Sequence, residues 1–224
     1  MMKLSETTLN VLKNFSTINT GLSVKTGNTI RTISKQQNVL AKATVSENFD
    51  KEFVIYDLNR FLGTLTSLND PDITINSDKK VITIKSGASK TIYGLSDEAM
   101  IVAPPTKELK VENAEVNFEL SKDNLSQILK MSGVLGLPNI AVVGDGKKIH
   151  ASTLDAKNDQ CDNFSIEVGS TEDTFKFIFT TENLKMIPGD YDVAISSKGI
   201  SHFKSKSSPV EYWVATEAGS KYGA

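Results

Sequence analysis

The sequence predicts an α+β protein made of two similar domains, each with two helices packed on antiparallel β-sheets. Amphipathic helical patterns alternate with groups of short strands, a mixture typical of this fold class. The opening pattern, Leu4-Ser5 followed by Leu9, recurs as Leu120-Ser121 followed by Leu125. A chain of 224 residues has room for two small domains, so the recurrence is interpreted as an internal duplication.

The first half is predicted to begin with a helix. Ser5 is a suitable N-cap, and the apolar residues that follow, Leu12 and Phe15 among them, fall on one helical face. A second helix begins after Asp57 and is stopped by Asn69-Asp70-Pro71. The other segments of this half have the short apolar pattern of strands and lie at 22–25, 29–34, 39–45, 52–55, 73–75, 81–85 and 90–93.

A connector is predicted at 101–114, which leaves 1–100 and 115–224 as the two domains. Ala103-Pro104-Pro105 cannot continue a strand ladder, because proline donates no backbone hydrogen bond. The residues at 107–113 that follow are mostly charged or polar.

The second half repeats the order of elements. A helix is predicted over 120–131, and another over 181–187 that Pro188-Gly189 ends. Asp-Gly at 145–146, between alternating apolar residues, is a strong hairpin signal. The polar loop at 155–163 is interpreted as an insertion, and the role of Asp155–Asp162 is left open. Strands are predicted at 115–120, 139–143, 147–153, 164–168, 174–179, 191–195, 200–205 and 211–216.

The residue types predict no enzyme, metal site or cofactor. His150 and His202 lie in predicted strands without a nucleophile beside them in the sequence. The single cysteine, Cys161, stands among acidic residues, which disfavour a reactive thiolate. The net charge of −2 is unlike that of a small basic DNA-reading module, so any contact with nucleic acid must be confined to one face. No apolar run is long enough to predict a membrane span.

Each predicted helix carries an acid in its first turn and a basic residue farther along. One interpretation is compensation of the helix dipoles and solvated faces. The other is that the polar faces together hold a polyanion, because phosphates need only point charges at tolerant spacing. The basic residues in question are Lys13, Arg60, Lys122, Lys130 and Lys185.

Several short segments, in the right order and at the right spacing along nearly the whole chain, resemble a known family. They are Leu12-Lys13-Asn14-Phe15, Ile55-Tyr56-Asp57-Leu58-Asn59, Val102-Ala103-Pro104, Leu184-Lys185-Met186, Pro188-Gly189-Asp190-Tyr191 and Val214-Ala215. The chain is similar in these segments to the DNA sliding clamps of the T-even bacteriophage type. The loop at 155–162 and the tail after Ala218 match less well.

This resemblance implies a DNA-clamp fold and a homotrimeric ring around duplex DNA. Such a ring tethers the phage DNA polymerase as a processivity factor, is opened by a clamp loader ATPase complex, and serves late transcription factors. It would act in the cytoplasm of the infected bacterial host and use no cofactor. The rival hypothesis is a duplicated β-rich structural or adapter protein that binds only protein partners.

The resemblance also implies three sets of site residues. The helix cations named above would face DNA. Partners would insert a short apolar peptide beside the connector, at Val102, Pro104, Val214 and Ala215, unless these residues only pack the connector down. Subunits would meet through Thr91, Ile92 and Tyr93 of one copy and Phe164 and Ile166 of the next.

Overall fold

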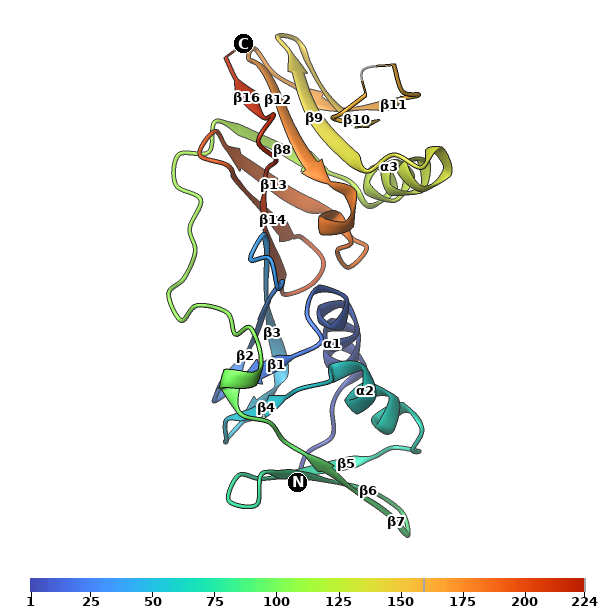
Figure 1. Cartoon of the computed structure of the whole chain (residues 1–224), viewed down its shortest axis with the longest axis vertical. Coiled ribbons are helices and arrows are strands. Elements are labelled where there is room, and N and C mark those ends of the chain that lie inside the picture. The colour runs from blue at the N-terminus through green and yellow to red at the C-terminus, as the bar shows by residue number, and fades with distance from the viewer. Residues whose placement is uncertain (159, 224) are drawn as a thin grey trace. The chain divides into compact units, whose positions relative to one another are not determined.

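The computed structural model describes residues 1–158 and 160–223 (Figure 1). The chain divides into two compact units, Met1–Lys107 and Glu108–Ala224. Each unit combines antiparallel sheets with helical segments, and the described residues form three α-helices. The α+β class predicted from the sequence is confirmed.

The two helices of the first unit form where the sequence places an N-cap. In α1 (Glu6–Ile18), Ser5 Oγ accepts from the Thr8 amide at 3.2 Å. In α2 (Leu58–Thr66), Asp57 Oδ1 accepts from the Arg60 amide at 2.9 Å. The apolar faces of the two helices are buried, and α1 contacts both α2 and the sheet. Both helices are where the apolar periodicity predicts them.

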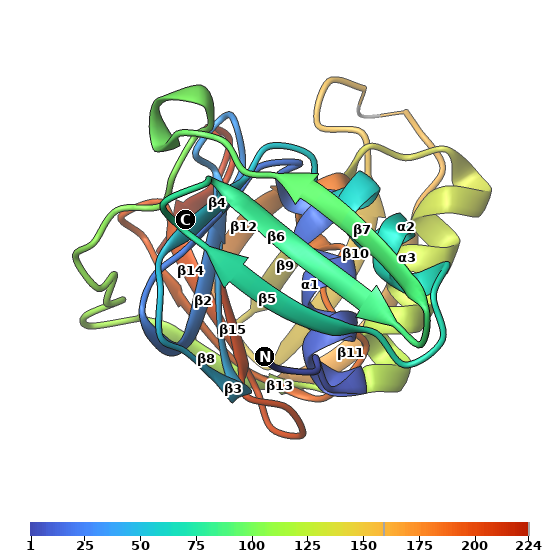
Figure 2. The ribbon, with the colours of Figure 1, turned by 90° about the horizontal axis from the view of Figure 1, so that it is seen from below.

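The strands of the first unit form two antiparallel groups. In the order β4-β1-β2-β3, these are β4 (Phe53–Ile55), β1 (Leu22–Val24), β2 (Gly27–Ile33) and β3 (Val39–Phe49). The second group, seen face on in Figure 2, is β5 (Asp72–Asn76), β6 (Val81–Ser86) and β7 (Ser89–Gly94), with β7 at an edge. A 3₁₀ turn, η1 (Glu98–Met100), follows β7.

The second unit opens with β8 (Val116–Leu120) and α3 (Lys122–Leu135), which Ser121 caps. One sheet has the order β11-β10-β9-β12-β16, and β15-β14-β13-β8 is the other group of strands. Their bounds are β9 (Asn139–Asp145), β10 (Lys148–Leu154), β11 (Phe164–Ser170), β12 (Thr174–Thr180), β13 (Tyr191–Ser196), β14 (Ile200–Ser205), β15 (Val210–Ala215) and β16 (Lys221–Tyr222).

The two units share one topology. The order β12-β9-β10-β11 repeats β4-β1-β2-β3, and β13-β14-β15 repeats β5-β6-β7. Even the first strand of the second unit has a counterpart, because β8 pairs with β13 while Met2 forms an isolated bridge to Ile73 in β5. The connection from β10 to β11, at 155–163, is longer than that from β2 to β3, at 34–38.

The fourth helix, predicted over 181–187, is a single 3₁₀ turn, η2 (Thr181–Leu184). No side chain caps it at Thr180, and Lys185 already leaves helical geometry at φ −73° and ψ 65°. Leu184 and Met186, two positions apart, are both buried, which an extended chain achieves and a helix does not. The α3 helix, in contrast, runs one turn beyond its predicted end, to Gly136 at φ +65°.

Candidate functional site

The two basic residues of the first unit that were predicted to face DNA lie on the exposed faces of its helices. Lys13 is exposed on the side of α1 opposite the buried Leu12 and Phe15. Arg60 is likewise exposed on α2, while Phe61 beside it is buried. Both side chains are therefore available to an anion outside the unit.

Of the three basic residues predicted to face DNA in the second unit, two lie on a helix and one does not. Lys122 and Lys130 are exposed on α3, where the buried residues include Leu125 and Ile128. Lys185, expected on an inner helix, instead follows the turn η2, and its Nζ lies 2.6 Å from Glu182 Oε2. The helical placement of Lys185 is therefore wrong, because the turn η2 ends at Leu184.

Three hydroxyl groups beside Lys13 and Arg60, on α1 and α2 or at the end of α2, are directed to their own helices. Thr17 Oγ1 donates to the Asn14 carbonyl at 2.7 Å, and Ser67 Oγ donates to the Gly63 carbonyl at 2.7 Å. Thr64 Oγ1 bonds in the same way to the Arg60 carbonyl, at 2.9 Å. An anion beside these faces would therefore meet the charges of Lys13 and Arg60 rather than a set of hydroxyl donors.

Each unit presents a free sheet edge among the described residues, β7 in the first and β11 in the second. On β7, Ile92 is 62% exposed. Tyr93 points the other way: its ring packs edge-on against Phe61 at 5.3 Å between centroids, and its hydroxyl donates to the Asp57 carbonyl at 2.8 Å. Burial raises the pKa of the Tyr93 phenol. The Tyr93 side chain therefore packs within the unit, and its backbone is what the edge presents.

The β11 edge has two chemically distinct faces. Phe164 and Ile166 are half-buried on one face, and α3 contacts this strand. Ser165 and Glu167 are exposed on the other face. Glu167 Oε1 lies 2.6 Å from Nζ of Lys148 on the neighbouring strand.

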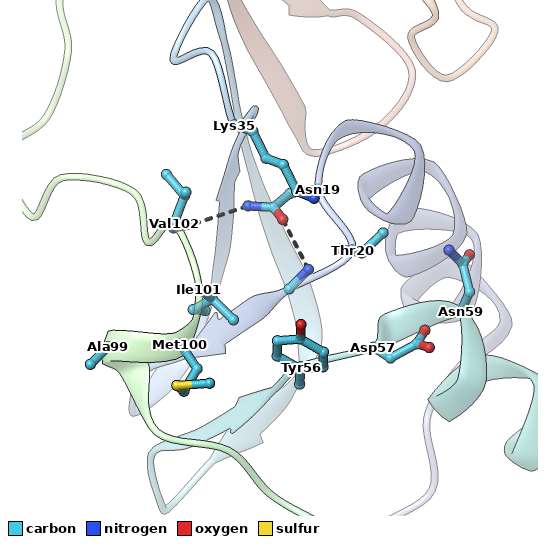
Figure 3. Close-up of a pocket in the computed structure, with 11 residues that line it drawn as sticks. Asn19, Thr20, Lys35, Tyr56, Asp57, Asn59, Ala99, Met100, Ile101 and Val102 are labelled. Atoms are coloured by element: carbon cyan, nitrogen blue, oxygen red, sulfur yellow. Dashed lines mark hydrogen bonds between the residues drawn. The ribbon is translucent and has the colours of Figure 1, made fainter.

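A cavity of about 520 Å³ lies in the first unit where α1, the start of α2 and the segment after β7 meet (Figure 3). Tyr56 and Met100, 60% and 64% exposed, are prominent apolar groups at it. Val102 also lines the cavity. Its remaining lining residues are Asn19, Thr20, Gly21, Lys35, Asp57, Asn59, Ala99 and Ile101.

Asn19 fixes the wall of this cavity. Its Nδ2 donates to the Val102 carbonyl at 3.0 Å, and its Oδ1 accepts from the Gly21 amide at 2.9 Å (Figure 3). The same Nδ2 also donates to the Ile33 carbonyl at 2.8 Å. A Cβ on Gly21 would lie 2.5 Å from the Ile101 side chain, so this position requires glycine. The anchoring role of Asn19 was not predicted, since an isolated asparagine carries no periodic signal in the sequence.

The other residues expected at a partner-peptide pocket differ in how deeply they are buried. Pro104 is half-buried, and the next carbonyl, that of Pro105, accepts from Arg31 Nη1 at 3.1 Å. Val214 is fully buried in the core of the second unit, so the expectation that it lines an open pocket is wrong. Its side chain packs inward from β15, whereas Ala215 beside it is half-buried.

The described residues give no sign of two other site types. None of their helices is long and apolar enough to cross a membrane. Within the same part of the chain, histidine, cysteine and carboxylate side chains form no group of three or more that could hold a metal ion.

Known proteins match this chain along nearly its whole length. A family described as DNA polymerase processivity factor matches residues 3–103, and one described as gp45 sliding clamp, C terminal, matches residues 117–218. A sliding clamp of Vibrio phage KVP40 is 35% identical over 97% of this chain and 100% of the relative. The chain belongs to the sliding clamp family of T4-like phages. The sliding clamp of Enterobacteria phage T4 is 33% identical, over 99% of both chains.

Solved structures with low sequence identity show the clamp fold. The proliferating cell nuclear antigen in a complex from A. fulgidus aligns with a TM-score of 0.68 over 95% of this chain and 96% of that chain, at 12% identity. The β subunit of DNA polymerase III from Pseudomonas aeruginosa aligns with a TM-score of 0.66 over 96% of this chain and 63% of that chain, at 13% identity. The DNA-clamp fold and the function of a DNA polymerase processivity factor, both predicted above, are confirmed.

Proposed function

We propose that this sliding clamp works as a homotrimeric ring that encircles duplex DNA and tethers the phage replicative polymerase without catalysing a reaction. The observation that carries the proposal is the pair of units with one clamp topology, whose helices α1, α2 and α3 present exposed cations. The domains 1–100 and 115–224, joined by 101–114, are taken as two copies of one clamp domain. The ring acts in the cytoplasm of the infected host.

Enclosure holds the DNA in this proposal, so the contacts themselves need not be strong. Point charges on phosphates carry no sequence information, and their attraction weakens as salt rises. The DNA-facing residues are Lys13, Arg60, Lys122 and Lys130, with Lys185 as a weaker member because Glu182 pairs with it. Hydroxyls that bond to their own helices leave few directional donors to stop the DNA from sliding.

The ring closes head to tail in this proposal, with β7 of one copy beside β11 of the next. Pairing would hide two free edges that otherwise invite aggregation. The exposed Ile92 and the half-buried Phe164 give this contact an apolar component. Thr91, Ile166 and the backbone of Tyr93 complete it.

Protein partners of the ring are the polymerase, the clamp loader ATPase complex and late transcription factors. They dock a short apolar peptide beside the connector, at Val102, Pro104 and Ala215. The exposure of Met100 and Tyr56 at the cavity that Val102 lines supports an apolar contact there.

Reversing the helix charges tests the DNA-facing assignment. Lys13, Arg60, Lys122 and Lys130 are changed together to glutamate, and polymerase stimulation is measured on primed circular DNA. We expect a loss of about tenfold or more, because the contacts with phosphate are replaced by repulsion. Light scattering, set against 24.4 kDa for one chain, checks that the trimer persists.

A matched control changes four exposed lysines outside the helices, Lys51, Lys79, Lys157 and Lys198, to glutamate. It alters the net charge equally and should leave stimulation within about twofold of the parent, since charges beyond a Debye length are screened. Equal losses in the two variants would remove the DNA-facing assignment. A clamp that shows no greater retention on a nicked circle than on linear DNA would instead favour the adapter that binds only proteins.

A further inference from the structure

The two free edges carry complementary side chains on their exposed faces. Successive residues of a strand alternate between faces, so Lys90 and Ile92 of β7 share the exposed face. On β11 the exposed face carries Ser165 and Glu167. A continuous sheet formed from both edges must match exposed face with exposed face.

Only a few antiparallel registers meet this condition. Placing Lys90 opposite Glu167 also places Ile92 opposite Ser165, and on the other face Thr91 opposite Ile166 and Tyr93 opposite Phe164. A shift by two residues in one direction places Ile92 opposite the carboxylate of Glu167. The opposite shift places Glu167 beyond the end of β7, at the Gly87-Ala88 turn. The first register alone places the lysine opposite the glutamate, and it leaves Ile92 opposite a serine rather than a carboxylate.

We propose that Lys90 of one copy pairs with Glu167 of the next and thereby sets the register and the head-to-tail direction of the ring, an inference that rests on the proposed ring closure. Two β7 edges would bring lysine to lysine, and two β11 edges would bring glutamate to glutamate, so like edges repel. The partner recognised by each edge is the other edge of a second copy of this chain.

The surroundings of both residues suit this pairing. Lys85 lies opposite Lys90 across the hairpin, so the β7 edge concentrates positive charge that an anionic partner would relieve. Glu167 contacts Lys148 through Oε1, which leaves its second carboxylate oxygen for another cation. In the assembled ring Glu167 therefore bridges two lysines, one from its own chain and one from the neighbour.

A charge-swap experiment tests the pair. K90E and E167K are made singly and together, and the concentration at which the ring dissociates is measured by sedimentation. Each single variant should raise this dissociation concentration about tenfold, because attraction between the two side chains becomes repulsion. In the double variant the dissociation concentration should return to within about twofold of the parent value. The controls K79E and E112K change exposed charges that lie outside both edge strands and should have no effect. A double variant no better than the singles would overturn the pairing.

A disulfide measurement reads the register directly. In a C161S background, K90C/E167C brings the two Cα atoms to about 5.5 Å in the proposed register, within disulfide reach. K90C/S165C places them about 7–8 Å apart, beyond it. Linked multimers from the first pair alone support the register, and efficient linking of the second pair overturns it. If the parent protein has the mass of a single chain in solution, ring closure itself is refuted. If the parent assembles but K90C/E167C forms no disulfide-linked multimers, only the register is refuted.

Discussion

At the scale of single residues, Asn19 holds the wall of the cavity in the first unit together. It is 4% exposed, and its amide joins the end of β2, the start of β1 and the first connector residues. Buried amides of this kind fix one backbone arrangement, because leaving their partners unsatisfied is costly.

Changing Asn19 to alanine should lower the free energy of unfolding by about 1–3 kcal/mol, because two buried backbone groups and one half-buried carbonyl lose a partner. Faster hydrogen exchange at 101–103 would show that the connector start has loosened. The matched control is Asn28→Ala, an exposed asparagine near the start of β2, which should change neither measurement. Unaltered exchange in the Asn19 variant would contradict the anchoring role.

At the scale of elements, the start of α1 is held to β3 by Glu47. Its carboxylate accepts hydrogen bonds from the Ser5 amide and the Thr8 hydroxyl. Burial alone would raise the pKa of Glu47, but these hydrogen bonds outweigh burial and hold the pKa below its usual value of 4.5. The helix is therefore secured by a charge that acid removes.

A folded-state pKa below the unfolded one means that this stabilisation is present above pH 4.5 and is lost as pH falls through the folded value. Replacing Glu47 with glutamine should lower the free energy of unfolding at neutral pH. The free energy of unfolding of this variant should also decrease less than that of the parent as pH falls. Chemical unfolding at a series of pH values measures both. Parallel curves for the variant and the parent would show that Glu47 does not contribute.

At the scale of the whole molecule, a net charge of −2 is combined with cations placed on exposed helix faces. Electrostatic contacts with DNA weaken with salt, while enclosure by a ring does not require them. Electrostatic contact and enclosure can therefore be distinguished by their dependence on salt.

Raising salt should release the clamp from linear DNA within seconds while a loaded clamp stays on a nicked circle until its subunits separate. Release from the two DNAs can be followed by fluorescence from a labelled clamp. The double variant K90E/E167K serves as a control, because its repaired interface should keep it on the circle. Equal salt sensitivity on circle and line would indicate that contacts, and not enclosure, hold the DNA.

The sequence by itself determined the positions of most elements and the family. Ser5, Asp57 and Ser121 cap helices where the local pattern predicts them, because capping and apolar periodicity involve residues only a few positions apart. The same pattern failed at 181–187, where the burial of Leu184 and Met186 overrides helix propensity.

Only the tertiary structure decided which distant segments meet. It turned Tyr93 toward Phe61, buried Val214, and added β16, which covers an edge of β12. It also built the Asn19 anchor from segments more than eighty residues apart in the chain. Such contacts depend on strand pairing and packing between remote parts of the chain, and a single sequence records periodicity along the chain but not the identity of the partner.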